Sequence, residues 1–541
     1  MKTYLGLGVG VIGLLLLSFG ALRIGGFQLT ASDYLRPQEH LIAQQVQTER
    51  ARSETGRVQN PEFARHLDQL IDQSPFASAR WGIKVVSMMN GEAVYERNAS
   101  RQFTPASNMK IYTTAAALDV LGVDYRWRTS VYAPSKPDAA GTIEGDLILY
   151  GRGAPDLVSE ASDENSLAKL ADAVYARGIR RVKGSVIGDE SYFRGNSLGD
   201  GWQWNDIQWY FGAEASALSI NGNEVDVNLL PPTKAGAPPE VRAADSQGYV
   251  EIDNRMAAGS RSARSTIGLY RGLSDNRVEV WGEFAAGAKG FGARLSVHNP
   301  ALWAARIFTT ALKAKGITVD GQAAARSSRS APHHRFDPAT ATEVAFVSSA
   351  SLAEIARITN KGSNNLYAEL ILRTLGRERR EMLSAPEPPG REFGDDEAGA
   401  ALLRMWLARN GVDTQNLALH DGSGLSRLNL VTPQTTVQLL TAVPHNSSGQ
   451  VFRESLPIAG KDGTLSGRLK TLTGRAFAKT GSLIYDNSLS GYVITEKGET
   501  LAFAIFCNDY TGTASSSRMI DQIVLILASY PDLPSQKGHK P

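Results

Sequence analysis

The stretch FTPASNMKIYTTAAALDVLG, residues 103–122, decides the fold class. It holds Ser107 and Lys110, three residues apart, ahead of an Ala-, Tyr- and Leu-rich run that predicts a helix buried on most sides. Residues three apart share one face of a helix, so the Lys110 amine can reach the Ser107 hydroxyl. Because a hydroxyl becomes a nucleophile when a neighbouring base accepts its proton, this S-x-x-K tetrad predicts an acyl-transfer site.

Two later motifs supply the context that a single tetrad lacks. Ser363-Asn364-Asn365 interrupts two helical patterns, SLAEIARITNKG and LYAELILRTLG, and a polar loop between helices can present side chains to a cleft. Lys479-Thr480-Gly481 stands in the strand-like run AFAKTGSL. The order S-x-x-K, S-x-N, K-T-G predicts three walls of one cleft.

The chain also contains competing matches to the first two motifs. Ser166 and Lys169 form a second S-x-x-K, but Asn165 or Ser166 there is expected to cap a helix. Ser274-Asp275-Asn276 is a literal S-D-N, yet the residues after it alternate in polarity, which predicts a turn leading into a strand. Ser107 and Ser363 are therefore the better candidates.

Other hydrolase and metal motifs find no support. Residues 195–199 match G-x-S-x-G, but the nucleophile elbow needs a following helix and DGWQWND shows no helical period. The eight His residues are scattered, and the chain has neither H-E-x-x-H nor a cysteine cluster. We expect no Ser-His-Asp triad, no metal and no cofactor.

The length of the chain and its net charge limit the classes of protein to which it can belong. A chain of 541 residues predicts two or more domains. Its 57 basic and 55 acidic residues nearly balance at a net charge of +2, and no basic cluster is present. A nucleic-acid partner is not expected.

The first residues predict export. Residues 5–22 are uncharged and apolar, with Lys2 before them and Arg23 after them, which fits a signal peptide or a membrane anchor within residues 1–30. A polar linker follows at 31–58. The lone Cys507, in the apolar run AFAIFCND, permits no internal disulfide and is expected in the core.

The gap of 256 residues between Ser107 and Ser363 indicates an insertion. Residues 131–340 contain short alternating runs separated by Gly and Pro, which predict a beta-rich insert of one or two subdomains. The peptidase domain would then be discontinuous, at 59–130 and 341–530, with a tail at 531–541. A hairpin at Asn90-Gly91, three strand-like runs near the C-terminus and a closing helix predict an α+β domain whose two ends share one sheet.

Each candidate residue has an expected role. Ser107 is the nucleophile, and Lys110 is its base if burial and the nearby cation Lys479 lower its pKa. Ser363 passes the proton to the leaving amine, and the Asn365 amide orients the substrate. Lys479 also grips a substrate carboxylate.

Three neighbours complete the expected substrate site. Thr480 shares the carboxylate with Lys479, and Gly481 lets a peptide lie against the strand edge. The backbone N–H groups of Ser107 and Ser482 form the oxyanion hole.

The motif order with its long insertion resembles the serine D-alanyl-D-alanine carboxypeptidases of peptidase family S13, the class C low-molecular-mass penicillin-binding proteins. Further stretches that resemble the family are GDLILYGRGAPDL, SALSINGNEVDV, SVHNPALWAA, DGSGLSRLNLVTP and LPIAGKDGTLSGRL, so the likeness spans roughly residues 60 to 530. It implies a beta-lactamase/transpeptidase-like domain, an antiparallel sheet flanked by helices, with inserted domains. By the same resemblance, Asp189 and Arg427 match positions near the peptide pocket.

The implied substrates are peptidoglycan stem peptides, from which the family removes terminal D-Ala and, in many members, cleaves the D-Ala to diaminopimelate cross-link. Acylation by beta-lactam antibiotics is implied as well, in the periplasm or at the outer face of the cytoplasmic membrane. The alternatives are a serine beta-lactamase or esterase, for which the chain shows no recognisable glutamate loop, and a non-catalytic wall-associated penicillin-binding scaffold. The sequence indicates neither an oligomeric state nor a preference between carboxypeptidase and endopeptidase action.

Overall fold

The computed structural model describes residues 60–159, 165–231, 236–244, 246–260, 264–329, 336–383, 393–511 and 515–533, with the backbone of 23–24 and 27–28. The chain divides into two compact units, Met1–Gln59 and Asn60–Pro541. In the first, β1 (Arg23–Ile24) pairs with β2 (Phe27–Gln28). The predicted export segment at 5–22 and the predicted linker at 31–58 lie outside the described residues. Within the described part, no helix combines the length and apolar character of a membrane span.

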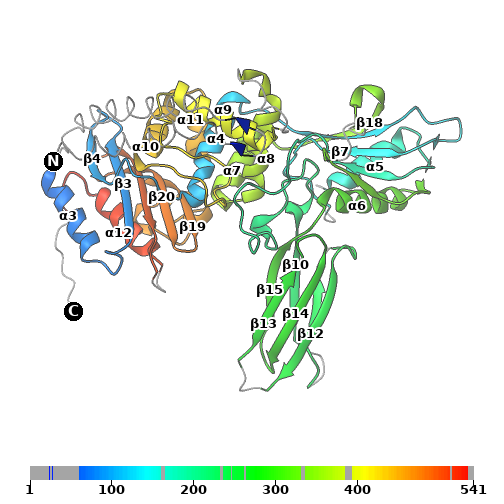
Figure 1. The fold of residues 1–541 in the computed structure, drawn as a ribbon, viewed down its shortest axis with the longest axis horizontal. Helices are drawn as coiled ribbons and strands as arrows, with labels where there is room; N and C mark the ends of the chain where they lie inside the picture. The colour runs from blue at the N-terminus through cyan, green and yellow to red at the C-terminus, as the bar shows by residue number, and fades with distance from the viewer. Residues whose placement is uncertain are drawn as a thin grey trace. The chain divides into compact units, whose positions relative to one another are not determined.

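An antiparallel five-stranded sheet joins the two ends of the second unit (Figure 1). Its order is β19-β20-β21-β3-β4, and the register pairs Trp81 with Cys507 and Ile83 with Ile505. The prediction that both chain ends share one sheet is confirmed. The strands are β3 (Arg80–Ser87), β4 (Ala93–Arg97), β19 (Ala476–Leu483), β20 (Asp486–Ile494) and β21 (Thr500–Asn508).

Alternate residues of β21 are buried on opposite faces of this sheet, as the two-residue period of a strand requires. Phe503, Ile505 and Cys507 pack in the core formed with α3 (Pro61–Asp72) and α12 (Ser517–Leu527). Phe506 and its even-numbered neighbours pack in the core that contains α4 (Met109–Val120) and α10 (Pro433–Ala442). The sheet is thus the middle layer of an α+β domain.

The helices that carry the predicted motifs pack beside this sheet. Helix α4 is buried from Met109 to Leu118, as its Ala-rich sequence predicts. Helix α7 (Leu352–Gly362) begins at the cap Ser351 and ends at Ser363, and α8 (Asn365–Glu378) follows at once. The remaining helices of this region are α9 (Asp395–Arg409) and α11 (Gly449–Ser455).

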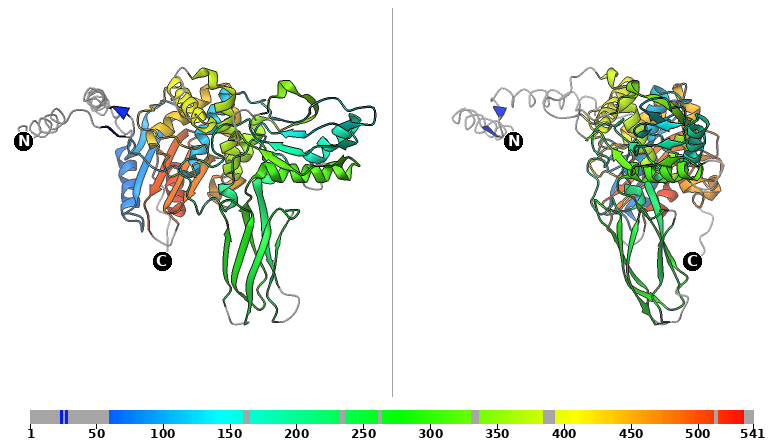
Figure 2. Two further views of the ribbon diagram at one scale, coloured as in Figure 1. Left: turned by 45° about the vertical axis from the view of Figure 1, so that its right-hand side comes forward. Right: turned by 90° about the vertical axis from the view of Figure 1, so that its right-hand side faces the viewer.

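Between α4 and α7 the chain forms two further groups of strands (Figure 2). The first has the sheet β17-β9-β7-β5-β18, a small sheet β16-β8-β6, and the helices α5 (Ser166–Ala176) and α6 (Pro300–Ala314). The second consists of two three-stranded sheets, β11-β10-β15 and β12-β14-β13.

The bounds of these strands are β5 (Arg128–Ala133), β6 (Thr142–Ile143), β7 (Leu147–Tyr150), β8 (Arg181–Val182), β9 (Val186–Asp189), β10 (Glu224–Leu230), β11 (Glu240–Ala243), β12 (Glu251–Gly259), β13 (Thr266–Arg271), β14 (Arg277–Ala285), β15 (Phe291–Ser296), β16 (Thr318–Val319), β17 (Ala324–Arg326) and β18 (Thr342–Ser348). The strand-rich insertion agrees with the predicted fold class.

Two elements of the inserted segment depart from the sequence patterns. Helix α6 stands where only strands were expected, with Asn299 capping its start and Pro300 at its first position. Strand β17 lies in a stretch without an alternating pattern, and it pairs in parallel with β9 from far along the chain. Parallel pairing leaves no local turn signal in the sequence.

The competing motifs are structural. The Asn165 side chain accepts a hydrogen bond from the Ala168 N–H and caps α5, so the second S-x-x-K is a helix start. Residues 274–276 form the bend that leads into β14, and no helix follows residues 195–199. These expectations are confirmed.

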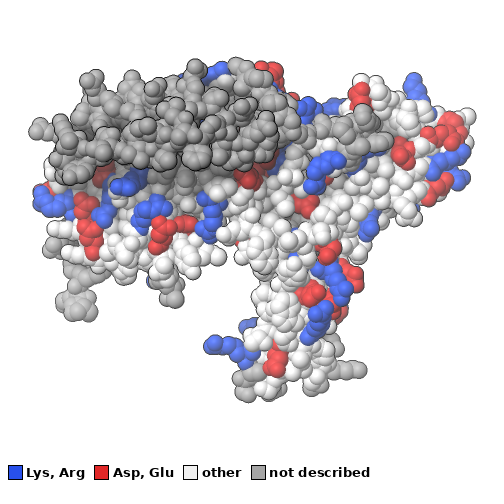
Figure 3. Space-filling view, viewed as in Figure 1, with Lys and Arg blue, Asp and Glu red and all other residues white. Residues whose placement is uncertain are grey.

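Charged side chains of both signs are interspersed on the described face of the molecule in Figure 3. On β12 and β14, for example, Asp253 pairs with both Arg255 and Arg277. This face therefore offers no single-sign field of the kind that attracts nucleic acid.

Replacement of a residue packed between the five-stranded sheet and the helices α3 and α12 tests the fold. Ile505→Ala removes a fully buried side chain and is expected to lower the free energy of unfolding by about 2–5 kcal/mol. Leu525→Ala, on the exposed side of α12, is expected to change it by less than about 0.5 kcal/mol. Urea unfolding followed by tryptophan fluorescence measures both, and equal effects would contradict the layer assignment.

Candidate active site

Ser107 and Lys110 lie together where α4 begins. Ser107 stands in a short 3-10 turn, Ala106–Asn108, and is half-buried, whereas Lys110 is fully buried. The Lys110 Nζ lies 3.0 Å from the Ser107 Oγ, as the tetrad spacing predicts. The same nitrogen donates to Asn365 Oδ1 at 2.6 Å and to the Ser423 carbonyl at 2.6 Å. Three segments far apart in sequence therefore converge on one amine.

The junction of α7 and α8 provides the second wall. Ser363 ends α7 with a left-handed φ of 58°, and the Asn364 side chain caps α8 by accepting the Tyr367 N–H. This turn places Ser363 Oγ 2.9 Å from Lys479 Nζ. The Asn365 amide donates to the Phe211 carbonyl at 2.8 Å, so its oxygen faces Lys110.

Edge strand β19 forms the third wall. Lys479 is fully buried and also donates to the Thr480 carbonyl at 2.8 Å, while the Thr480 hydroxyl contacts that of Thr464. The Ser482 side chain is exposed and donates to Asn487 Oδ1. Lys479 and Ser363 are thus within hydrogen-bonding distance.

Gly481 meets a packing constraint in addition to its expected role. A Cβ at this position would lie 2.2 Å from Ser488 Oγ and 2.7 Å from the Pro105 carbonyl. The missing side chain therefore lets β19 pack against the segment that carries Ser107. The expected role of Gly481 beside a bound peptide stays a prediction.

Burial changes the protonation of both lysines. It lowers the pKa of Lys110 to about 7, against the opposing effect of the carboxyl groups of Asp421 and Glu369. Burial and the neighbouring Lys110 hold the pKa of Lys479 well below its usual range. The predicted effect of burial on Lys110 is found, whereas the like-charge effect acts on Lys479. A substantial fraction of Lys110 is then neutral near pH 7 and can accept the Ser107 proton.

A cavity of about 700 Å³ opens onto these residues. Ser107, Ser363, Asn365, Ser482 and Arg427 line it. The inserted segment supplies another part of the lining, including Asp206, Tyr210, Phe211 and Arg294. The insertion therefore shapes the space around the nucleophile.

The resemblance pointed to Arg427 in the loop at 421–429, but the contact by which this loop holds the Lys110 amine in place was missed. The Asp421 carboxylate accepts hydrogen bonds from Ser423 Oγ and from the N–H groups of Gly424 and Ser426. The Asn429 amide and the Trp202 indole N–H donate to it as well. The Asp and two Gly of DGSG were the available signal for a tight polar turn.

Gly424 brings that loop onto the nucleophile. It has a φ of +82°, and a Cβ there would lie 1.8 Å from the Ala106 carbonyl. The loop can therefore place the Ser423 carbonyl against Lys110 only with glycine at this position.

Glu369, on α8, is a second missed residue. Its Oε1 accepts the N–H groups of Gly422 and Ser423, both at 2.9 Å. Its side chain is fully buried, which raises its pKa to about 8, with Asp421 adding to the rise. Glu369 thus positions the carbonyl that contacts Lys110, but in the helical pattern LYAELILRTLG it looked like an ordinary helix residue.

The two residues matched by resemblance, Arg427 and Asp189, lie in different surroundings in the structure. Arg427 lines the cavity and pairs with Asp486 at 3.0 Å. Asp189 is fully buried at the end of β9, pairs with Arg326 at 3.3 Å, and is not among the described residues that line the cavity. Two acids of the inserted segment do line it, Asp206 and Glu224, and the carboxyl of Asp206 interacts with Arg427. The only sequence signal of Asp206 is the aromatic-rich GWQWNDIQWYFG.

Comparison with known proteins agrees with this geometry. The model of the D-Ala-D-Ala carboxypeptidase 3 (S13) family matches residues 63–530. The chain belongs to this family. It is 34% identical over 489 residues to the D-alanyl-D-alanine carboxypeptidase of Actinomadura sp. (strain R39), covering 88% of this chain and 86% of that protein. It is 27% identical to the D-alanyl-D-alanine carboxypeptidase DacB of Haemophilus influenzae, covering 83% and 90%.

Solved structures give the same family fold. Penicillin-binding protein 4 (dacB) of Haemophilus influenzae superimposes with a TM-score of 0.74 at 25% identity, covering 86% of this chain and 99% of that one. Its complex with a novel beta-lactam matches with a TM-score of 0.68 at 23% identity, covering 86% and 100%. This chain thus has the fold of a penicillin-binding protein, as the resemblance implies.

The protonation of Lys110 predicts how acylation depends on pH. Since only the neutral amine accepts a proton, acylation of Ser107 by a thioester substrate is expected to rise about tenfold per pH unit below pH 7 and to level off above it. Glu369→Gln keeps an oxygen for the two N–H groups but removes a carboxyl group that raises the Lys110 pKa. Because the Glu369 carboxyl ionises only near pH 8, this variant is expected to sharpen the upper part of the rise and to leave the part well below pH 7 unchanged.

Glu354→Gln is the matched control, because Glu354 pairs with Arg357 at the exposed start of α7. Stopped-flow rates between pH 5 and pH 9 compare the three proteins. An unchanged profile in Glu369→Gln would show that Glu369 does not influence the base.

Proposed function

We propose that this protein is a serine DD-peptidase that cleaves the D-Ala-D-Ala end of peptidoglycan stem peptides, the D-Ala to diaminopimelate cross-link, or both. The observation that carries the proposal is the distance of 3.0 Å between the Lys110 amine and the Ser107 hydroxyl, beside a cavity of about 700 Å³. Burial lowers the pKa of Lys110 to about 7, so this amine can be neutral near pH 7. Membership of the S13 family supports the same activity. Beta-lactams, whose ring amide resembles the scissile bond, would acylate the same serine.

In the proposed acylation, Ser107 Oγ attacks the carbonyl carbon of the penultimate D-Ala while its proton passes to Lys110. The C–N bond then breaks, and the leaving amine takes a proton from Ser363, which regains the proton that Lys110 took from Ser107, directly or by way of Lys479. The Lys479 Nζ lies 2.9 Å from Ser363 Oγ, close enough for this relay. Water then releases the acyl group, with Lys110 again accepting a proton.

Recognition of the substrate's terminal carboxylate falls to Lys479 and Thr480. A fully buried amine is hard to protonate, but an anion beside it favours the ammonium form. Binding of a carboxylate would therefore charge Lys479 only when substrate is present. This favours substrates with a free C-terminal carboxylate or its beta-lactam equivalent.

At another part of the cavity Asp206 and Arg427 supply one charge of each sign. The carboxylate of Asp206 makes no hydrogen bond with any described residue, so it is available to a ligand ammonium. Diaminopimelate ends in an ammonium and a carboxylate on one carbon, which fits this pair. Asp206 and Arg427 would thus select stem peptides by their third residue.

A beta-lactamase or esterase is the less favoured alternative. Fast deacylation needs a base that activates water beside the ester, and Glu224, the acid of the cavity wall on β10, is paired with Arg294 at 3.0 Å. We further propose export to the periplasm or to the outer face of the cytoplasmic membrane, with residues 5–22 as signal or anchor. The peptidase domain would comprise 59–130 and 341–530.

The site assignment predicts a specific covalent adduct. Benzylpenicillin is expected to add one equivalent to the wild-type mass and none to Ser107→Ala. Ser166→Ala, which alters the other S-x-x-K, should form the adduct like the wild type, since Ser166 begins α5. Intact-mass spectrometry distinguishes these outcomes, and an adduct in Ser107→Ala would reject the nucleophile.

The acid at 206 predicts substrate preference. Asp206→Asn is expected to lower kcat/KM on diaminopimelate-containing pentapeptides by about tenfold or more, because a charge-assisted contact is worth roughly 1.5–3 kcal/mol. Peptides with lysine at that position, lacking the second carboxylate, should already be poorer substrates of the wild type. Asp226→Asn, an exposed position on β10, is the control. Equal kinetics for Asp206→Asn and wild type on both peptides would exclude the contact.

A further inference from the structure

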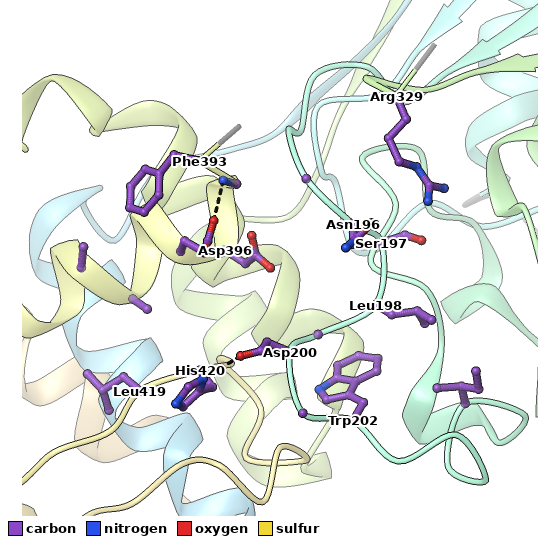
Figure 4. A pocket seen from close by; sticks show the side chains of 18 of the residues that line it. Asn196, Ser197, Leu198, Asp200, Trp202, Arg329, Phe393, Asp396, Leu419 and His420 are labelled. Carbon is purple, nitrogen blue, oxygen red and sulfur yellow. Dashed lines mark hydrogen bonds and ion pairs between the residues drawn. The ribbon is translucent and has the colours of Figure 1, made fainter. Parts of the chain in front are cut away.

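A second and larger cavity, of about 1120 Å³, lies beside the segment 195–207 (Figure 4). Its lining comes from this segment, from the start of α9, and from Leu419 and His420. The residues of the catalytic mechanism are not among the described residues that line it. The proposed function leaves this cavity unexplained.

Aromatic side chains form part of the lining of the second cavity. Trp204 is 66% exposed, which is unusual for an indole on a monomer surface. Trp202 stands close by and is held rigidly, because its indole N–H donates to Asp421 Oδ2 at 2.9 Å. Phe393 contributes a third ring. Flat apolar faces that need no rearrangement suit a ligand with flat apolar faces of its own.

Charged side chains of both signs also line this cavity. Asp200 and His420 pair at 2.8 Å across the cavity wall and face one another in Figure 4. Asp396, Glu397, Arg329 and Arg404 add two acids and two bases. Because these charges nearly balance, the cavity does not select an ion. It offers donors and acceptors beside aromatic rings, the combination that a neutral polyhydroxylated ring requires.

The position of the cavity connects it to the catalytic site. The segment that lines it also sends Gln203 and Asp206 into the catalytic cavity. Gly201 packs this segment tightly on the 421–429 loop, since a Cβ there would lie 2.6 Å from Ser426 Oγ. One stretch of chain is therefore a shared wall of two cavities. A polymer could occupy both, with one chemical part on each side.

We propose that the second cavity binds the neutral amino-sugar backbone of peptidoglycan while a stem peptide occupies the catalytic cavity. This inference rests on the proposed function, since the glycan and the peptide are parts of one polymer. Trp204 stacks on the C–H face of a sugar ring, and Asp200 and its neighbours accept from the ring hydroxyl and acetamido groups. The site would direct the enzyme to peptides that are still attached to glycan.

Titration of the full-length protein with glycan tests this inference. The probes are peptide-free glycan strands and the β-1,4-linked tetramer of N-acetylglucosamine, with binding measured by calorimetry. Wild type is expected to bind both saturably, and Trp204→Ala to bind at least tenfold more weakly. Asp200→Asn is expected to weaken binding too, and serves if Trp204→Ala melts at a lower temperature.

Trp281→Ala is the matched control, because Trp281 on β14 is also exposed, at 46%, but does not line the cavity. It should bind like the wild type. Absence of saturable binding by wild type, or equal binding by Trp204→Ala and Asp200→Asn and wild type, would overturn the inference. Penicillin adduct formation in the same wild-type sample tests the proposed function separately: an adduct without glycan binding rejects the glycan site alone, and glycan binding without an adduct rejects the peptidase.

Discussion

A lysine amine buried beside a serine hydroxyl is the constraint on which the rest of this site depends. Lys110 is removed from water, so each of its hydrogen-bond positions must be met within the protein. Ser107, Asn365 and Ser423 meet them, one from each of three segments. The same burial that requires these partners lowers the pKa of the amine to about 7 and makes it a base.

Bringing three segments onto one nitrogen limits the backbone around it. Gly424 and Gly481 stand where a Cβ would collide with the Ala106 and Pro105 carbonyls, so both walls close only through glycine. Glu369 and Asp421 hold the backbone of the 421–429 loop, and their carboxyl groups also oppose the fall in the Lys110 pKa. Position and protonation of the base are therefore set by the same acids. The inserted segment adds Asp206 to the cavity and, on its other side, forms the second cavity.

Features that depend on short spacings along the chain could be predicted from the sequence. Ser107 and Lys110 follow from helical spacing, and the shared sheet follows from strand patterns at both ends of the chain. Ser423 acts through its backbone carbonyl, which every residue possesses, so no side-chain pattern could reveal it. The role of Asp206 could not be predicted, because the sequence does not show which loop of the insertion folds over the cavity. The resemblance pointed to Asp189 instead. Pairing across long sequence distances, as for β17 and β9, leaves no local mark either.

The most direct test of the account is the ionisation of Lys110 itself. Protein labelled with carbon-13 at the lysine ε-methylene can be titrated by NMR, with Lys110→Arg used to assign the resonance. The account predicts a titration midpoint near pH 7, far below that of the surface lysines. A Lys110 resonance that stays in the ammonium form above pH 9 would contradict a neutral lysine base.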